Sequence, residues 1–175
     1  LIEKEKETGG NLRNWYKLFP DRRNSTEVMD YLKKQTALPG IKIMNSTTVE
    51  KLQNVRNRFI LMTNEGTEVY ADALVVATGF TLFNTSRKEE YGYGIYDNVI
   101  ASADLEAMFK NGKITMSDGR TPGTVGMVNC VGSRDEKVGN LYCSKLCCVT
   151  AVKQAIEIVE QYRLPTFSSL DPTQW

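Results

Sequence analysis

Residues 73–79 decide the fold: they read Ala-Leu-Val-Val-Ala-Thr-Gly, a continuous apolar run that ends in a polar residue and a glycine. An apolar run without polar alternation is typical of a strand buried on both faces, as in a parallel sheet covered by helices. Ligands of such sheets bind beside the carboxyl ends of the strands, which is where Thr78 and Gly79 stand. The run therefore predicts an α/β sheet with a binding site at its end.

The segments before this run follow the order of a nucleotide-binding domain. Residues 1–3 are typical of the end of a strand, Gly9-Gly10 interrupts the next loop, and Asn24 with Glu27 predicts a capped helix start. Short strands are expected at 41–44, 47–52, 58–63 and 67–70, the last two as a hairpin. We predict an α/β fold: an FAD/NAD(P)-binding Rossmann-like, three-layer domain with a small antiparallel insert.

A second strand–loop–helix unit begins after residue 100. Its expected elements are a helix at 104–110, a buried strand at 125–131, a polar loop at 132–140 and a long helix at 141–162. We predict that residues 1–100 form a partial FAD-binding domain and that residues 101–175 start a second nucleotide-binding-like unit. Because Leu1 already stands in a strand and no G-x-G-x-x-G loop precedes Glu3, we expect a fragment of a longer protein.

Composition excludes several classes of function. Hydrophobic residues make up 41% and charged residues 25% of the sequence, as in a globular domain, and the net charge of +1 gives no reason to expect a nucleic-acid partner. No apolar run approaches the roughly 18 residues of a membrane span, so we expect a soluble, cytoplasmic protein. The complete lack of histidine excludes Ser-His-Asp triads, Cys-His nucleophile pairs and histidine metal sites.

All four cysteines lie close together in the second unit. Cys130 is expected at the end of a strand, and Cys143, Cys147 and Cys148 in the first turns of the next helix. Four thiolates without imidazole suit an iron–sulfur cluster, although zinc also binds four thiolates. Buried cysteines that only pack the strand against the helix are an equal alternative. The lack of a C-x-x-C pair argues against a dithiol redox site.

Three features of the first unit favour a flavin dinucleotide. Glu3 closes a strand, where its carboxylate can accept hydrogen bonds from the adenosine ribose. Gly9 and Gly10 let a loop pass close to the pyrophosphate without a side-chain clash. Thr78-Gly79 ends the central strand at the ligand-binding edge. In this order along the chain, these residues predict bound FAD.

Five stretches match a known family: 75–80, 87–94, 98–100, 129–136 and 142–148. The most specific are Asn-Cys-Val-Gly-Ser-Arg-Asp-Glu at 129–136 and Tyr-Cys-Ser-Lys-Leu-Cys-Cys at 142–148. With these residues the sequence resembles the A subunit of heterodisulfide reductase and its bacterial relatives. The resemblance covers about residues 1–163, and residues 164–175 do not match the family.

The resemblance implies a thioredoxin-reductase-like flavoprotein with FAD and a [4Fe–4S] cluster. The implied cluster ligands are Cys130, Cys143, Cys147 and Cys148. The implied flavin contacts are Glu3, Lys4, Gly9, Gly10, Val49 through its backbone, Thr78 and Gly79. It further implies an oxidoreductase that relays electrons between FAD and the cluster. Its expected partners are other redox subunits of such a complex and further copies of the same chain.

Two alternatives from other classes remain at this point. One is a zinc-stabilised interaction module that catalyses nothing. The other is a fragment of an FAD- and NAD(P)H-dependent disulfide reductase. The lack of a C-x-x-C pair argues against the reductase, and so does the sequence Val131-Gly132-Ser133-Arg134, which stands where a glycine-rich phosphate loop would be.

Overall fold

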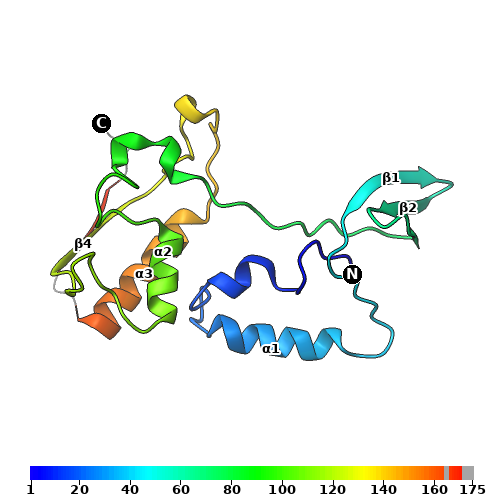
Figure 1. Cartoon of the computed structure of the whole chain (residues 1–175), viewed down its shortest axis with the longest axis horizontal. Coiled ribbons are helices and arrows are strands. Elements are labelled where there is room, and N and C mark those ends of the chain that lie inside the picture. Colours follow the sequence, from blue (N-terminus) through cyan, green and yellow to red (C-terminus); the bar gives the residue numbers. More distant parts are fainter. Residues whose placement is uncertain (164–165, 171–175) are drawn as a thin grey trace. The chain divides into compact units, whose positions relative to one another are not determined.

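The computed structural model describes residues 1–163 and 166–170 (Figure 1). Its contacts divide the chain into two compact units. The first unit comprises Leu1–Arg13 and Thr26–Phe80, and the second comprises Asn14–Ser25 and the described residues from Thr81 onward. The chain therefore enters the second unit briefly before helix α1 and returns to it after Phe80. The predicted boundary at residue 100, between a partial FAD-binding domain and a second nucleotide-binding-like unit, stays a prediction.

The first unit contains one helix and a small antiparallel sheet. Helix α1 spans Ser25–Thr36, and the sheet consists of β1 (Val49–Val55), β2 (Arg58–Thr63) and β3 (Glu68–Ala71) in the order β1-β2-β3. Both strand pairs are antiparallel, and the register of β1 against β2 shifts near its start. The helix start near Asn24 and the antiparallel insert predicted from the sequence are confirmed.

The run at 73–77 is not the buried strand that its composition predicts. No strand of the described residues pairs with it, and the side chains of Val75 and Val76 are 86% and 74% exposed. A strand becomes buried on both faces only where neighbouring strands and covering helices exist, and the described part of this unit supplies neither beside the run. The expected strands at 1–3 and 41–44 are likewise reduced to a single parallel bridge between Ile2 and Met44.

The second unit packs two helices beside a short parallel strand pair. Helix α2 spans Ser102–Lys110 and α3 spans Cys147–Tyr162, while β4 (Thr124–Val128) pairs in parallel with β5 (Thr166–Leu170). The buried core joins α2, β4 and α3, and consists of Leu105, Phe109, Ile114, Met127, Ala151, Ala155 and Ile158. Helices, a parallel strand pair and a separate antiparallel sheet confirm the α/β class.

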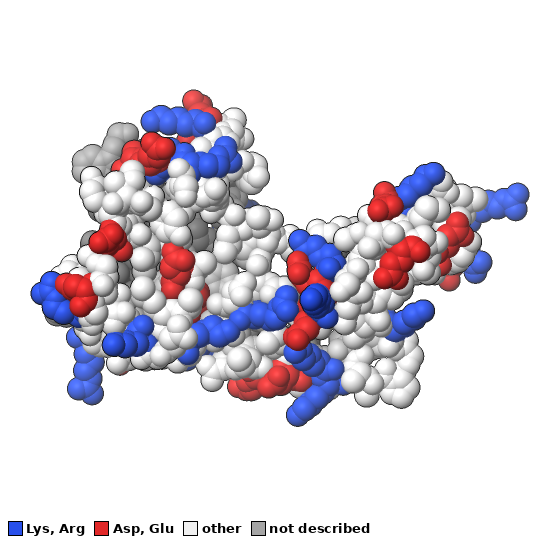
Figure 2. All heavy atoms as spheres, in the orientation of Figure 1, with Lys and Arg blue, Asp and Glu red and all other residues white. Residues whose placement is uncertain are grey.

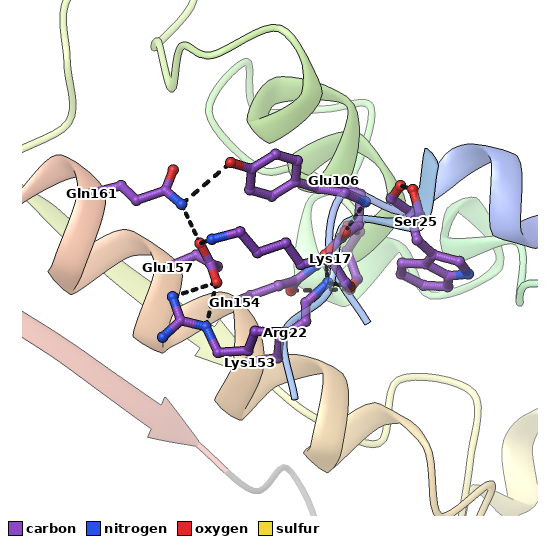
Figure 3. A network of polar contacts seen from close by, with 11 residues as sticks. Lys17, Arg22, Ser25, Glu106, Lys153, Gln154, Glu157 and Gln161 are labelled. Atoms are coloured by element: carbon purple, nitrogen blue, oxygen red, sulfur yellow. Dashed lines mark hydrogen bonds and ion pairs between the residues drawn. The ribbon is translucent and has the colours of Figure 1, made fainter. Parts of the chain in front are cut away.

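Buried ion pairs fasten residues 14–25 to the helices of the second unit (Figure 3). Glu106 of α2 and Glu157 of α3 are both buried. Glu106 pairs with Lys153 at 2.5 Å, and Glu157 pairs with Lys17 at 2.8 Å and Arg22 at 2.6 Å. Because a buried charge is costly unless it is paired, these contacts fix residues 14–25 against α3.

The charged surface is mixed rather than of one sign. On the face shown in Figure 2, acidic and basic side chains alternate over the described residues, in agreement with the net charge of +1. Among the described helices, none is both long enough and apolar enough to cross a membrane.

Candidate functional site

Cys130 lies in a tight turn directly after β4. Its side chain is buried and its backbone is left-handed, with φ of 60°. The Ser133 amide donates a hydrogen bond to the Cys130 carbonyl at 3.0 Å. Gly132 follows with φ of 76°, and a Cβ added there would lie 2.4 Å from the ring of Phe83. Cys130 is thus held by a turn that tolerates little change.

The loop after Cys130 closes on itself and brings the chain back to Cys143. Asp135 and Asn140 exchange two backbone hydrogen bonds, at 2.7 and 3.0 Å. The side-chain amide of Asn140 also donates to the Gly132 carbonyl at 2.9 Å. The Arg134 amide also donates to the Tyr142 carbonyl at 3.1 Å. These bonds fix the loop between the first and second cysteine.

Helix α3 begins at Cys147 and not at Leu141, so the predicted helical position of Cys143 is wrong. Lys145 has a left-handed backbone with φ of 59°, which interrupts any helix before it. Instead, residues 143–146 form a turn in which the Lys145 amide donates to the Cys143 sulfur at 3.3 Å. Cys143 and Cys148 are exposed, whereas Cys147 is partly buried.

The pKa values of Cys147 and Cys148 are shifted in opposite directions. Partial burial opposes ionisation of Cys147, but hydrogen bonds from the Cys130 backbone, Ser144 and the thiols of Cys148 and Cys130 lower its pKa. The negative charge of Cys147 raises the pKa of Cys148, and the charges of Cys130 and Cys143 add to this effect. The pKa of each of these two thiols therefore depends on its cysteine neighbours.

The donor set fits a thiolate-bound metal centre. Four cysteine sulfurs within one segment of a chain without histidine are the ligands that iron–sulfur clusters and structural zinc use. In the described part of the chain, however, no three Cys, Asp or Glu side chains are already arranged around a metal position. Because like-charged thiolates repel without a cation, final convergence of the sulfurs is expected on binding.

Sequence reasoning missed the contact of Lys88 with the loop between Cys130 and Cys143. Its ammonium is buried and lies 2.7 Å from carboxylate oxygens of both Glu90 and Asp135. Hydrogen bonds from Lys88 lower the pKa of Asp135 and of Glu90. The charged run Arg-Lys-Glu-Glu at 87–90 is visible in the sequence. The pairing of Lys88 with Asp135, in the loop of residues 130–143 (the cysteine loop), is a tertiary contact that no local pattern indicates.

The predicted flavin residues lie in the first unit. The Glu3 amide donates to the Met44 carbonyl at 2.9 Å, which continues the bridge made by Ile2. The Glu3 carboxylate accepts a hydrogen bond from the backbone amide of Glu5 at 3.0 Å. This local hydrogen bond orients the Glu3 side chain. Lys4 beside it is exposed, and Val49 begins strand β1 with 42% of its surface exposed.

The structure brings the Gly9-Gly10 loop to the end of the 73–79 run. Asn11 donates its side-chain amide to the Phe80 carbonyl at 2.7 Å, directly after Thr78 and Gly79. Gly9 has φ of 117°, and a Cβ there would lie 2.9 Å from the Met29 sulfur, whereas Gly10 faces open space. Two of the three predicted flavin segments are therefore neighbours.

Comparison with curated proteins finds relatives of one kind. The A subunit of the H2/formate:CoB-CoM heterodisulfide,ferredoxin reductase of Methanococcus maripaludis is 48% identical over 88 residues, which cover 47% of this chain and 13% of that protein. The A subunit of the ferredoxin/F420H2-dependent CoB-CoM heterodisulfide reductase of Methanosarcina acetivorans is 43% identical over 56% of this chain and 13% of its own. The iron-sulfur A subunit of the CoB–CoM heterodisulfide reductase of Methanocaldococcus jannaschii is 44% identical over a stretch that covers 51% of this chain and 14% of that protein.

These relatives confirm the resemblance to the A subunit of heterodisulfide reductases. The chain spans about one seventh of the length of the curated relatives it matches. No family model matches the sequence.

Two solved structures of oxidoreductases align with nearly the whole chain. An L-proline dehydrogenase from P. horikoshii aligns with 98% of this chain and 30% of its own, at a TM-score of 0.47 and 16% identity. The bacillithiol disulfide reductase Bdr of Bacillus cereus aligns over 97% of this chain and 59% of the reductase chain, at a TM-score of 0.44 and 12% identity.

Proposed function

We propose that the chain is part of an oxidoreductase of the heterodisulfide reductase type, equivalent to a piece of the A subunit, and that its four cysteines hold a [4Fe–4S] cluster. The observation that supports the proposal is the loop between Cys130 and Cys143, which hydrogen bonds between Asp135 and Asn140 close on itself, followed by Cys147 and Cys148 at the start of α3. A relative that is 44% identical carries "iron-sulfur" in its name.

In this proposal the first unit contributes to an FAD site and the second carries the cluster. Glu3 would orient the adenosine ribose, and the loop at Gly9 and Gly10 would run beside the pyrophosphate. The bound groups would supply one- and two-electron chemistry, while the chain sets their orientation and burial. Partner redox subunits would exchange electrons with them, as the names of the relatives suggest.

Anaerobic reconstitution with iron and sulfide tests the cluster. We expect a broad visible charge-transfer absorbance and about four irons per chain, because a cubane has four iron corners. Iron and zinc are measured on the same gel-filtered sample. Stoichiometric zinc without iron would replace the cluster by a structural zinc site and support the zinc-stabilised module.

Substitution of Glu3 tests the flavin site. In a fluorescence titration with FAD, Glu3→Ala should raise the Kd about tenfold, because a hydrogen bond to a charged group contributes roughly 1.5–3 kcal/mol. Glu65→Ala, in the exposed turn between β2 and β3, is the matched control and should leave the Kd unchanged. Equal affinities of the wild-type and Glu3→Ala chains would remove Glu3 from the site.

A further inference from the structure

Residues 83–91 contact the cysteine loop (residues 130–143) at two separate points. The ring of Phe83 packs so closely against Gly132 that an added Cβ would lie 2.4 Å from it. Farther along both segments, the Lys88 ammonium lies 2.7 Å from the Asp135 carboxylate. The cysteine loop is therefore shaped by residues outside it as well as by its own hydrogen bonds.

Lys88 is buried to an unusual degree for a lysine. It is only 5% exposed, and its ammonium is shared between Glu90 and Asp135, both at 2.7 Å. Its ammonium also lies 5.8 Å from the centre of the Tyr91 ring. An ammonium is buried in a protein only where carboxylates compensate it, so Lys88 and Asp135 constrain each other's positions.

Asp135 contributes to closure of the loop through both its side chain and its backbone. Its carboxylate accepts a hydrogen bond from the Lys137 amide at 3.0 Å and so caps the short helical turn Glu136–Val138. Its backbone makes both hydrogen bonds with Asn140 that bring the two sides of the loop together. The carboxylate that Lys88 holds thus lies in the fold between Cys130 and Cys143.

We propose that Lys88 is a positioning residue for the cysteine site: through Asp135 it fixes the loop that carries Cys130 and returns the chain to Cys143. The proposal rests on the proposed function for the identity of the bound cluster. The effect of Lys88 on the cysteines is a property of the chain itself and can be measured without metal.

Alkylation of the reduced, metal-free chain with iodoacetamide measures this effect. In Lys88→Met, Cys130 should be alkylated about tenfold faster than in the wild type, because the loop that buries it opens locally. Lys88→Arg keeps the charge and should restore a rate close to the wild-type value. Lys137→Met is the matched control, since Lys137 lies in the same loop but has an exposed side chain, and it should leave the alkylation rate unchanged.

Two results would overturn the role of Lys88. One is a wild-type alkylation rate in Lys88→Met, and the other is an equal acceleration in Lys137→Met, which would show that loss of any lysine beside the loop has this effect. In reconstituted protein, loss of iron to a chelator should be about tenfold faster in Lys88→Met than in the wild type. If the wild type takes up no iron, the proposed function fails, whereas the alkylation rates still decide the role of Lys88.

Discussion

Replacement of Cys148 by serine is expected to abolish stable cluster assembly in the chain. Cys148 is exposed, so the change removes a sulfur ligand without opening a hole in the core. Cys148 follows Cys147 in the first turn of α3, next to another proposed ligand. A serine oxygen is a harder ligand than the thiolate that iron–sulfur clusters use. After reconstitution and gel filtration, iron per chain should fall by about tenfold, because loss of even an outer-shell partner of a ligand typically lowers metal affinity by about 10–100-fold.

The control for this experiment is Val152→Ser, an exposed position farther along the same helix. It makes a similar change in size and polarity on α3 but removes no sulfur. We expect it to keep the iron content and the visible absorbance of the wild type. A Cys148→Ser chain with wild-type iron would exclude the four-thiolate site. Loss of iron in both variants would point to a defect in the helix instead.

The sequence predicted those elements whose determinants are local. The start of α1 depends on residues a few positions apart, and the hairpin of β2 and β3 depends on a short turn. Both are present where they were expected. The cysteine segment was found by the same route, because its four thiols stand out in composition before any contact is known.

Features that depend on distant residues could not be predicted in this way. The helical pattern of α3 extends back to Leu141, yet the left-handed Lys145 delays the start to Cys147 and moves Cys143 into a turn. The apolar run at 73–77 predicts a buried strand, although burial requires neighbouring strands that its own residues cannot supply. The pairing of Lys88 with Asp135 joins two loops and leaves no periodic signal.

Substitution of Glu106 by alanine should be among the most destabilising changes in the second unit. The Glu106 carboxylate accepts hydrogen bonds from Lys153 at 2.5 Å, Gln154 at 2.8 Å and the Tyr16 amide at 2.8 Å. Without it, the buried Lys153 ammonium keeps the Lys17 carbonyl at 2.9 Å but loses its carboxylate. Because removal of one partner leaves a buried charge uncompensated, the free energy of unfolding should fall by about 3–5 kcal/mol. Urea unfolding followed by circular dichroism measures the loss.

Two further variants separate the buried charge from other effects. Glu160→Ala removes an exposed carboxylate whose partner Arg22 still pairs with Glu157, so we expect a loss below about 1 kcal/mol. Glu106→Gln keeps the shape and some hydrogen bonds but removes the charge, and its stability should lie between that of Glu106→Ala and the wild type. If Glu106→Ala and Glu160→Ala unfold at the same urea concentration, the buried pair does not hold α2 against α3. Residues 14–25, which the Tyr16 amide and the Lys17 carbonyl tie to the same pair, would then need another anchor.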